Sequence, residues 1–184
     1  MRLLAALLAV AVLAPSALAL EVAGVQVDGA AELDGKKLVL NGAGLRKKLF
    51  FKVYVGALYV EQRSGDPAAI LSADAPRLVR LHMLRELDRE SILKAFREGI
   101  EKNSGAQAAA ALAKLAQVEK AIPAELKPGQ VVTVAYQPGA GTSLGIQGGT
   151  AASVEGKDFA DAILRVWLGD EPVDADLKAG MLGR

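Results

Sequence analysis

One arginine and a long apolar run make residues 41–61 the segment best suited to chemistry. Arg46 precedes residues 49–61, a run rich in Phe, Val, Tyr and Leu. The run is longer than an ordinary edge strand and is apolar on both alternating faces, so we predict a strand that is covered on both sides. A fixed positive charge at the entry to such a strand is suited to holding an anion in an apolar pocket. The residues also allow Arg46 to be a solvated turn residue, like Lys47 and Lys48.

Two glycines and the strand alternation define the geometry that we expect around this arginine. Gly42 and Gly44 can adopt positive φ angles, so they predict a sharp turn before the strand. Successive side chains of a strand point to opposite faces. The alternation therefore places Phe51 and Tyr59 on one face and Tyr54 on the other.

A second motif, at residues 141–145, matches the G-x-S-x-G pattern of a nucleophilic serine. That chemistry needs a helix directly after the serine and a histidine later in the chain. Here the sole histidine, His82, precedes Ser143, and two glycines follow instead of a helix. A glycine-containing hairpin strand is the better interpretation of the motif. His82 alternates with apolar neighbours and is typical of a sheet-surface histidine.

The composition predicts neither a metal nor a cofactor. With no cysteine and one histidine, only a site of hard oxygen ligands could hold a metal. The acids that cluster near the C-terminus, Asp170, Glu171, Asp174 and Asp176, are more typical of a helix cap and first helical turn.

Residues 1–19 have the pattern of a secretory signal peptide. Arg2 precedes an unbroken apolar run over residues 3–13, and Ala17 and Ala19 fit a small-x-small cleavage site. We therefore expect cleavage after Ala19 and export, most simply to a bacterial periplasm, with residues 20–184 forming a single domain. The apolar run is too short to span a membrane, and no later segment approaches that length.

The overall charge balance argues against nucleic acid, and against an anionic membrane, as the main partner. The chain has 22 Lys and Arg against 21 Asp and Glu, and removing Arg2 with the leader makes the two counts equal. Nucleic-acid binding proteins usually carry a basic excess or a basic patch. The sequence leaves the oligomeric state open.

Blocks of strands alternate with blocks of helices, which predicts an α+β fold with an antiparallel sheet packed against helices. Strands are expected at 22–27, 37–40, 49–61, 77–84, 130–136 and 143–147, with a turn at Asp34-Gly35. Helices are expected at 89–102, through Leu112 and Leu115 to no further than Ile122, at 157–168, and from a cap at Asp174 to near Gly183.

Two segments resemble the chalcone isomerase superfamily. GAGLRKKLFFKVYVGALYVE resembles the stretch in which a GAGxR turn leads into a strand, and AILRVWLGDEPVDADLKAGMLG resembles the C-terminal region. An exported, compact version is most similar to bacterial chalcone-isomerase-like proteins. The resemblance implies an open-faced β-sandwich, a large antiparallel sheet with a layer of helices on one side and a ligand cleft between them.

The resemblance also implies a role for Arg46, which matches the family's arginine. That arginine stabilises the phenolate and developing enolate in the plant enzymes and holds a carboxylate in the fatty-acid-binding relatives. The strand threonine of the enzymes falls at or near Tyr54 and is replaced, and a tyrosine there can donate a hydrogen bond beside the arginine. The enzymes' tyrosine and asparagine fall around Ser91 and Glu98, where neither residue type is kept.

Three functions follow from these observations. The leading hypothesis is non-catalytic binding of a small amphipathic anion such as a fatty acid. Arg46 would hold the acid group, Tyr54 would be a second donor, and the candidate walls are Phe51, Tyr59, Phe96 and Trp167. The alternatives are an intramolecular lyase-type isomerase that closes a ring by phenolate addition, and an envelope interaction or structural protein that uses only the scaffold. The enzymes' helix threonine falls near Val166, which is apolar, and this weakens the isomerase alternative.

Overall fold

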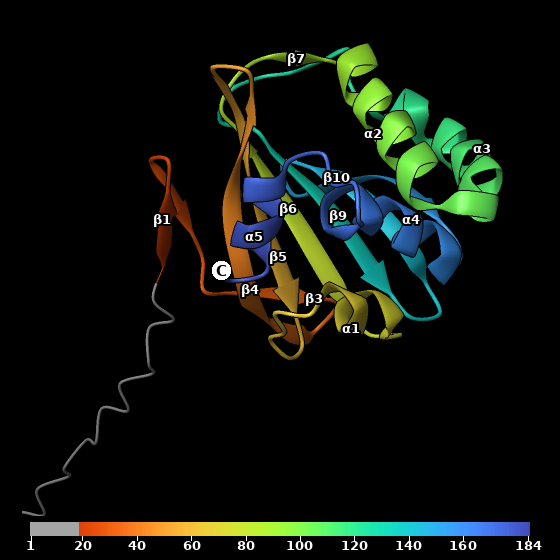
Figure 1. Cartoon of the computed structure of the whole chain (residues 1–184), viewed down its shortest axis with the longest axis horizontal. Helices are drawn as coiled ribbons and strands as arrows, with labels where there is room; N and C mark the ends of the chain where they lie inside the picture. The colour runs from red at the N-terminus through yellow and green to blue at the C-terminus, as the bar shows by residue number, and fades with distance from the viewer. Residues whose placement is uncertain (1–18) are drawn as a thin grey trace, which may run out of the picture.

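A seven-stranded antiparallel sheet forms the centre of the molecule in the computed structural model, which describes residues 19–184 (Figure 1). Its strands follow the order β11-β10-β9-β6-β5-β4-β3. Their bounds are β3 (Ala30–Leu33), β4 (Lys36–Lys48), β5 (Phe51–Val60), β6 (Arg77–Met83), β9 (Val131–Gln137), β10 (Gly141–Ile146) and β11 (Gly149–Val154). Two further antiparallel pairs are β1 (Leu20–Val22) with β2 (Val25–Val27) and β7 (Leu87–Asp88) with β8 (Glu125–Leu126).

Five α-helices accompany these strands within the described residues. They are α1 (Pro67–Ser72), α2 (Arg89–Asn103), α3 (Ala108–Val118), α4 (Lys157–Leu168) and α5 (Ala175–Met181), with short 3₁₀ turns at Gly105–Gln107 and Glu119–Ala121. None of the helices in this part of the chain is long and apolar enough to cross a membrane. The leader predicted over residues 1–19 lies, except for its last residue, outside the described residues.

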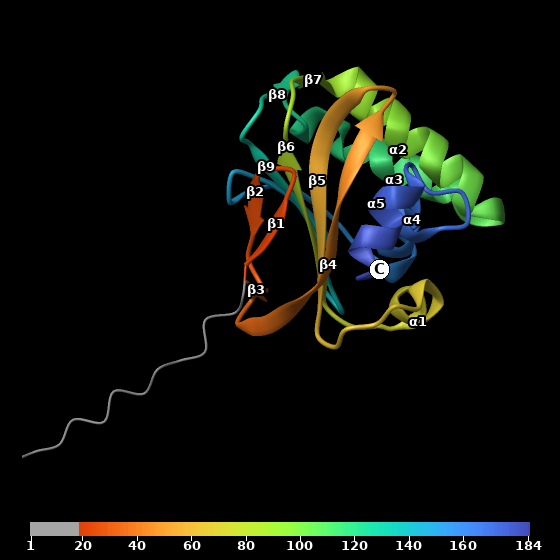
Figure 2. The same ribbon diagram turned by 60° about the vertical axis from the view of Figure 1, so that its left-hand side comes forward.

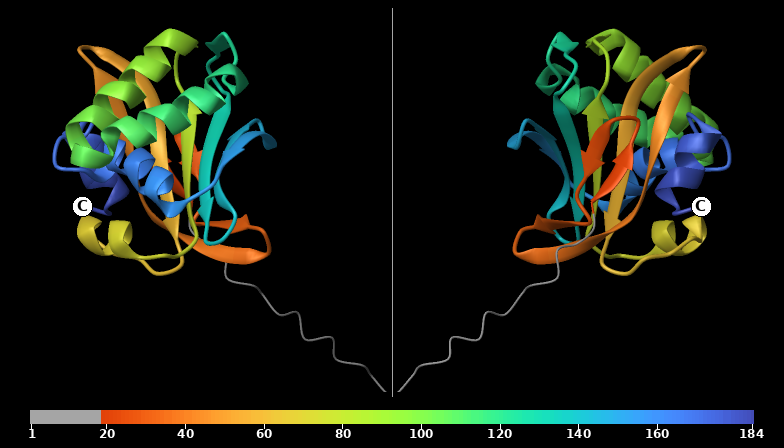
Figure 3. Two further views of the ribbon diagram at one scale, coloured as in Figure 1. Left: turned by 90° about the vertical axis from the view of Figure 1, so that its right-hand side faces the viewer. Right: turned by 90° about the vertical axis from the view of Figure 1, so that its left-hand side faces the viewer.

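The helices lie on one face of the curved sheet, and the β1–β2 hairpin lies against the other (Figure 2). The views in Figure 3 show the same two sides. Each side has its own apolar core. Leu58 and Trp167 belong to the core under the helices, while Val55 and Tyr59 belong to the core on the opposite face. The α+β prediction is therefore confirmed, and β5 is covered on both faces as its two apolar sides required.

Most predicted helix ends are confirmed because their caps form. The Asp88 carboxylate accepts the backbone N–H of Ser91 at 2.7 Å and starts α2. Asp174 accepts the N–H of Leu177 at 2.9 Å and starts α5. These side chains satisfy backbone N–H groups that have no partner within the first helical turn.

The predicted turn at Gly42 and Gly44 is wrong. Both glycines lie inside β4, and the chain reverses later, at Leu49 and Phe50. Helix α5 packs so closely on β4 that a Cβ on Gly42 would lie 2.2 Å from the carbonyl oxygen of Gly180. The glycines thus permit close contact between a helix and a strand, and do not form a turn.

Smaller differences concern short elements and one strand end. The segment predicted as one strand over 22–27 is the β1–β2 hairpin, because Ala23 and Gly24 both adopt positive φ. The strand expected over 37–40 extends to Lys48 in β4. The prediction does not include helix α1 or strands β3, β7, β8 and β11. The turn at Asp34-Gly35 is confirmed as the β3–β4 connection, and both of its residues have positive φ.

Candidate functional site

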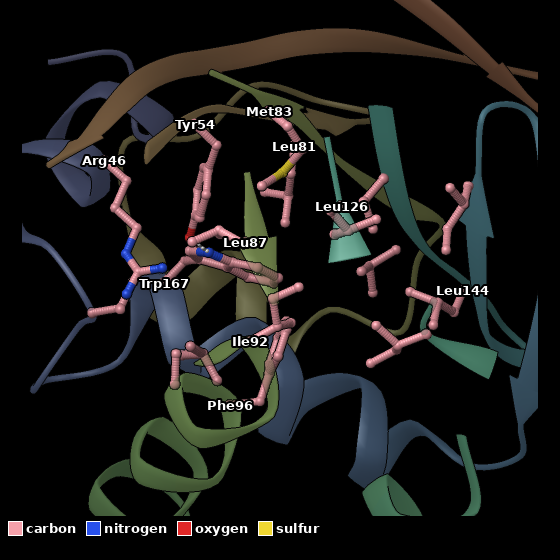
Figure 4. A pocket seen from close by; sticks show the side chains of 17 residues that line it. Arg46, Tyr54, Leu81, Met83, Leu87, Ile92, Phe96, Leu126, Leu144 and Trp167 are labelled. Carbon is pink, nitrogen blue, oxygen red and sulfur yellow. Dashed lines mark hydrogen bonds between the residues drawn. The ribbon is translucent and has the colours of Figure 1, made fainter. Parts of the chain in front are cut away.

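A small cavity lies between the helix-covered face of the sheet and helices α2 and α4 (Figure 4). Its volume is about 50 Å³. The central strands form one wall, and the helices together with the β7–β8 pair form the other. Of the side chains that line it, only Arg46, Tyr54 and Trp167 carry nitrogen or oxygen atoms. The cavity is therefore apolar, with one group of polar atoms.

Arg46 lies near the end of β4 and pairs in register with Tyr54 of β5. Its guanidinium carbon lies 5.3 Å from the centre of the Tyr54 ring, within the range of a cation–π contact. The guanidinium extends toward the Tyr54 hydroxyl and the Trp167 ring (Figure 4). The Nε atom of Arg46 is buried and has no hydrogen-bond partner among residues 19–184. Buried donors are almost always satisfied, so an unsatisfied N–H at this position is unusual.

Tyr54 offers a second donor beside the guanidinium. Trp167 Nε1 donates to the Tyr54 hydroxyl at 2.9 Å, so the hydroxyl oxygen acts as the acceptor and its own hydrogen remains free to be donated. Burial raises the pKa of Tyr54, and the nearby Arg46 charge opposes this only in part. The phenol is therefore neutral at ordinary pH. Together the two side chains present hydrogen-bond donors and one positive charge, which suits an anionic oxygen.

Trp167 and Phe96, two of the candidate wall residues, line the cavity. Trp167 is 1% exposed, and its ring meets the Phe96 ring edge-on, with centroids 5.6 Å apart. Helix α4 supplies the tryptophan and α2 the phenylalanine, so the packing of these two helices holds the aromatic wall in place.

Phe51 and Tyr59 do not line this cavity, contrary to the prediction. Tyr59 faces the opposite side of the sheet, where the Arg80 guanidinium lies 5.2 Å from its ring centre. Phe51 lies at the β4–β5 turn and is 57% exposed. The alternation of β5 explains the error for Tyr59, because Tyr59 lies five positions after Tyr54 and side chains an odd number of positions apart in a strand face opposite ways.

The structure also places the three residues that the resemblance aligns with polar residues of the enzymes, namely Ser91, Glu98 and Val166. The Ser91 hydroxyl donates to the Asp88 carboxylate at the start of α2. The Glu98 side chain is 55% exposed, and its carboxylate lies 3.9 Å from the Lys94 ammonium. Neither residue lines the cavity, whereas Val166 does. The arginine is thus present without the enzymes' other polar groups.

Sequence reasoning missed most of the aliphatic wall. Its members come from the sheet and from the segments flanking α2, and they include Leu81, Met83, Leu87, Leu126, Val132, Val134, Leu144 and Ile146. The sequence of β6 could have predicted two of them. Its apolar residues alternate with Arg80 and His82, which places Leu81 and Met83 together on one face of the strand. Residues 19–184 contain no group of three or more histidines and carboxylates that could hold a metal ion.

A family model described as chalcone isomerase-like matches residues 19–183. The chain belongs to the chalcone isomerase-like family. Among solved structures, a fatty-acid binding protein of Arabidopsis thaliana superposes with a TM-score of 0.69 at 19% sequence identity. The match covers 93% of this chain and 95% of that one. It establishes the chalcone isomerase-like fold, including the large sheet and its layer of helices. No curated protein sequence matches the chain.

Proposed function

We propose that this chalcone isomerase-like protein is an exported, non-catalytic binder of a small amphipathic anion such as a fatty acid. The observation that carries the proposal is the buried, unpartnered Nε of Arg46 at the polar end of an otherwise apolar cavity. A carboxylate placed there would accept from the guanidinium and from the Tyr54 hydroxyl. The structural relative in Arabidopsis thaliana, which is named a fatty-acid binding protein, supports the same chemistry.

The apolar wall would take the hydrocarbon tail. Two smaller cavities, of about 40 and 20 Å³, lie beyond the first one between the sheet and the helices. Phe96, Val134 and Leu144 line both the first cavity and the 40 Å³ cavity. A tail that entered from Arg46 would therefore pass between these side chains. Each buried methylene contributes about 0.8 kcal/mol, so the tail would supply most of the affinity.

The present volume of the cavity determines what binding requires. A space of about 50 Å³ is smaller than the roughly 150 Å³ of an apolar cavity that binds benzene. An acyl chain therefore has to displace some of the side chains that line the cavity. Leu87, Ile92 and Phe96 are the best suited to move aside, because they are only partly buried. The same small volume is the observation that favours a second candidate function, a structural or interaction protein that keeps the scaffold and binds no ligand.

Titration with dodecanoate distinguishes these functions. Trp167 is the only tryptophan and lines the cavity, so its fluorescence reports entry of a ligand directly. We expect saturable binding that Arg46→Ala weakens by about tenfold or more, since a charge-assisted hydrogen bond contributes about 1.5–3 kcal/mol. Arg63→Ala is the matched control, because it removes an exposed arginine away from this cavity. Absence of saturable binding, or equal binding by both variants, overturns the proposal.

The isomerase alternative uses the same two groups. A guanidinium beside a phenol could stabilise negative charge that develops on an oxygen during ring closure. The disappearance of a chalcone's visible absorbance, compared with its spontaneous rate, tests this directly. An acceleration that Arg46→Ala abolishes would establish the enzyme function, and an unchanged rate removes it for that substrate.

Export is proposed from the leader pattern of residues 1–19. Expression of the full chain in a bacterium should yield a periplasmic protein that begins at Leu20. A protein that retains Met1 in the cytoplasm would contradict this part of the proposal.

A further inference from the structure

The tip of the β4–β5 hairpin exposes three large apolar side chains in a row. Leu49 is 83% exposed, Phe50 is 98% exposed and Phe51 is 57% exposed. We define the tip as residues 47–52. It projects beyond the body of the sheet, next to β7 (Figure 1). Apart from Leu20, these three are the large hydrophobic residues that are exposed in the described part of the chain.

Leu49 has a backbone conformation that is uncommon for a leucine. Leu49 is the first residue of a two-residue turn and has φ of 55°. Glycine is the usual residue at such a position, because a side chain with positive φ is strained. A leucine there gives up local stability to present an apolar side chain to solvent. Residues held in sparsely populated conformations are enriched at functional sites.

Positive charge surrounds the apolar residues. Lys47 and Lys52 face each other across the hairpin, and Lys48 pairs with Phe51. None of the three lysines forms an ion pair within residues 19–184. The Arg85 guanidinium lies 4.7 Å from the centre of the Phe51 ring and adds a fourth cation. Two acids also lie close to these residues: Asp174 accepts the backbone N–H of Lys47, and Glu86 follows Arg85.

We propose that the tip docks the protein on the surface of an anionic lipid bilayer. The leucine and phenylalanine side chains would enter the boundary between headgroups and acyl chains, and the lysines and Arg85 would contact anionic headgroups. Aromatic and aliphatic residues flanked by lysines have this mode of binding at interfaces. An anionic bilayer is opposite in charge to the tip, and it can accept a narrow projecting turn.

A protein partner fits this surface less well. Stable protein interfaces bury about 1,200–2,000 Å² in total, which three side chains on a projecting turn do not supply. A bilayer needs no matching pocket, because its acyl chains accommodate the wedge. Docking would also bring Arg46, which directly precedes the tip in β4, close to the membrane. The inference itself does not depend on what Arg46 binds.

Sedimentation with lipid vesicles tests the proposal on the chain that starts at Leu20. Vesicles of equal parts phosphatidylcholine and phosphatidylglycerol should bind the protein, and added salt should weaken the binding. Phe50→Ser should weaken it by about tenfold or more, since an apolar side chain of this size leaves the lipid. The side chain is almost fully exposed, so this substitution should leave the thermal unfolding temperature unchanged.

A matched pair of double variants isolates the charge. Lys47→Gln with Lys48→Gln should weaken vesicle binding by roughly 25-fold, at about fivefold per lysine near an anionic surface. Lys37→Gln with Lys102→Gln removes the same charge from exposed positions away from the tip and should leave binding within about twofold. Three outcomes overturn the proposal: no vesicle binding, equal binding by both double variants, or a dimer of the native chain that Phe50→Ser converts to monomer. The last outcome would make a second copy of the chain the partner of the tip.

Discussion

Arg77 and Arg46 both lie over a tyrosine ring on the helix-covered side of the sheet, but their surroundings differ. The Arg77 guanidinium lies 4.8 Å from the centre of the Tyr136 ring, and that of Arg46 lies 5.3 Å from the centre of the Tyr54 ring. Arg77 is 4% exposed, and both of its Nη atoms have hydrogen-bond partners. Its Nη1 donates to the carbonyl oxygen of Ile70 at 3.2 Å, and its Nη2 pairs with Asp161.

The partners of Arg77 connect three elements. Ile70 belongs to α1 and Asp161 to α4, while Arg77 itself begins β6. Lys157 also pairs with Asp161, at 2.6 Å, so the carboxylate joins a small network. Arg46 has no comparable network, and its buried Nε lacks any partner. The two arginine–tyrosine contacts therefore have different roles. The satisfied arginine links three elements of the fold, and the unsatisfied one retains unused hydrogen-bonding capacity.

The largest expected effect comes from breaking the satisfied contact. Arg77→Met should lower the free energy of unfolding by about 3 kcal/mol, at the low end for a broken buried ion pair, because Lys157 remains beside Asp161. Urea denaturation of the variant measures this. Dodecanoate affinity at temperatures where the variant stays folded should be unchanged. A loss below about 1 kcal/mol would show that the network around Arg77 contributes little.

The corresponding change at the other arginine should barely affect stability. Arg46→Met keeps most of the apolar stem and removes a buried donor that has no partner. We expect the free energy of unfolding to change by less than about 1 kcal/mol, in either direction. The same urea titration compares the two variants directly. A loss as large as that of Arg77→Met would mean that Arg46 is a structural residue, and the contrast between the two contacts would disappear.

The sequence predicted the fold well where local chemistry decides the structure. Helix α2 and helix α5 begin at aspartates that were recognised as caps, and the Asp34-Gly35 turn was recognised from its dipeptide. Helix α1 could have been found in the same way, since Asp66 caps it and Pro67 occupies its first position. Strand β11 carries no such signal, because most of its side chains are exposed and small.

The candidate site was predicted only in part, because it depends on contacts between distant segments. Arg46, Tyr54, Phe96 and Trp167 meet at the cavity. The apolar strand after Arg46 had already singled out this arginine, and the resemblance to a family added support. The roles of Gly42 and Gly44 could not be read locally, since the helix that approaches them is more than a hundred residues away in the chain. Tyr59 was misplaced for a simpler reason. Tyr54 and Tyr59 lie on opposite faces of β5, so the two side chains cannot line the same cavity.

A histidine on the opposite face tests whether an unsatisfied buried atom is enough to indicate a ligand site. The Nε2 atom of His82 is buried without a partner, as Arg46 Nε is, but His82 lines none of the cavities described above. Burial and the neighbouring Arg80 charge lower the pKa of His82, and Asp28 opposes this shift. The folded protein therefore disfavours the charged imidazole.

The lowered pKa of His82 gives stability a small pH dependence. Below the usual histidine pKa of about 6.5, the unfolded chain takes up a proton before the folded chain does, so stability falls as pH decreases through that value. The loss should stay below about 1 kcal/mol because the ring is partly exposed and water screens the charge. Urea denaturation at pH 7.5 and 5.5 measures it, and His82→Gln should remove this component of the pH dependence (both pH values are about one unit from the usual pKa). Dodecanoate affinity at pH 7.5 should be the same for His82→Gln and the native chain. A clear loss of affinity in this variant would show that an unsatisfied atom indicates a ligand even without a cavity, and the contrast with Arg46 would then need another basis.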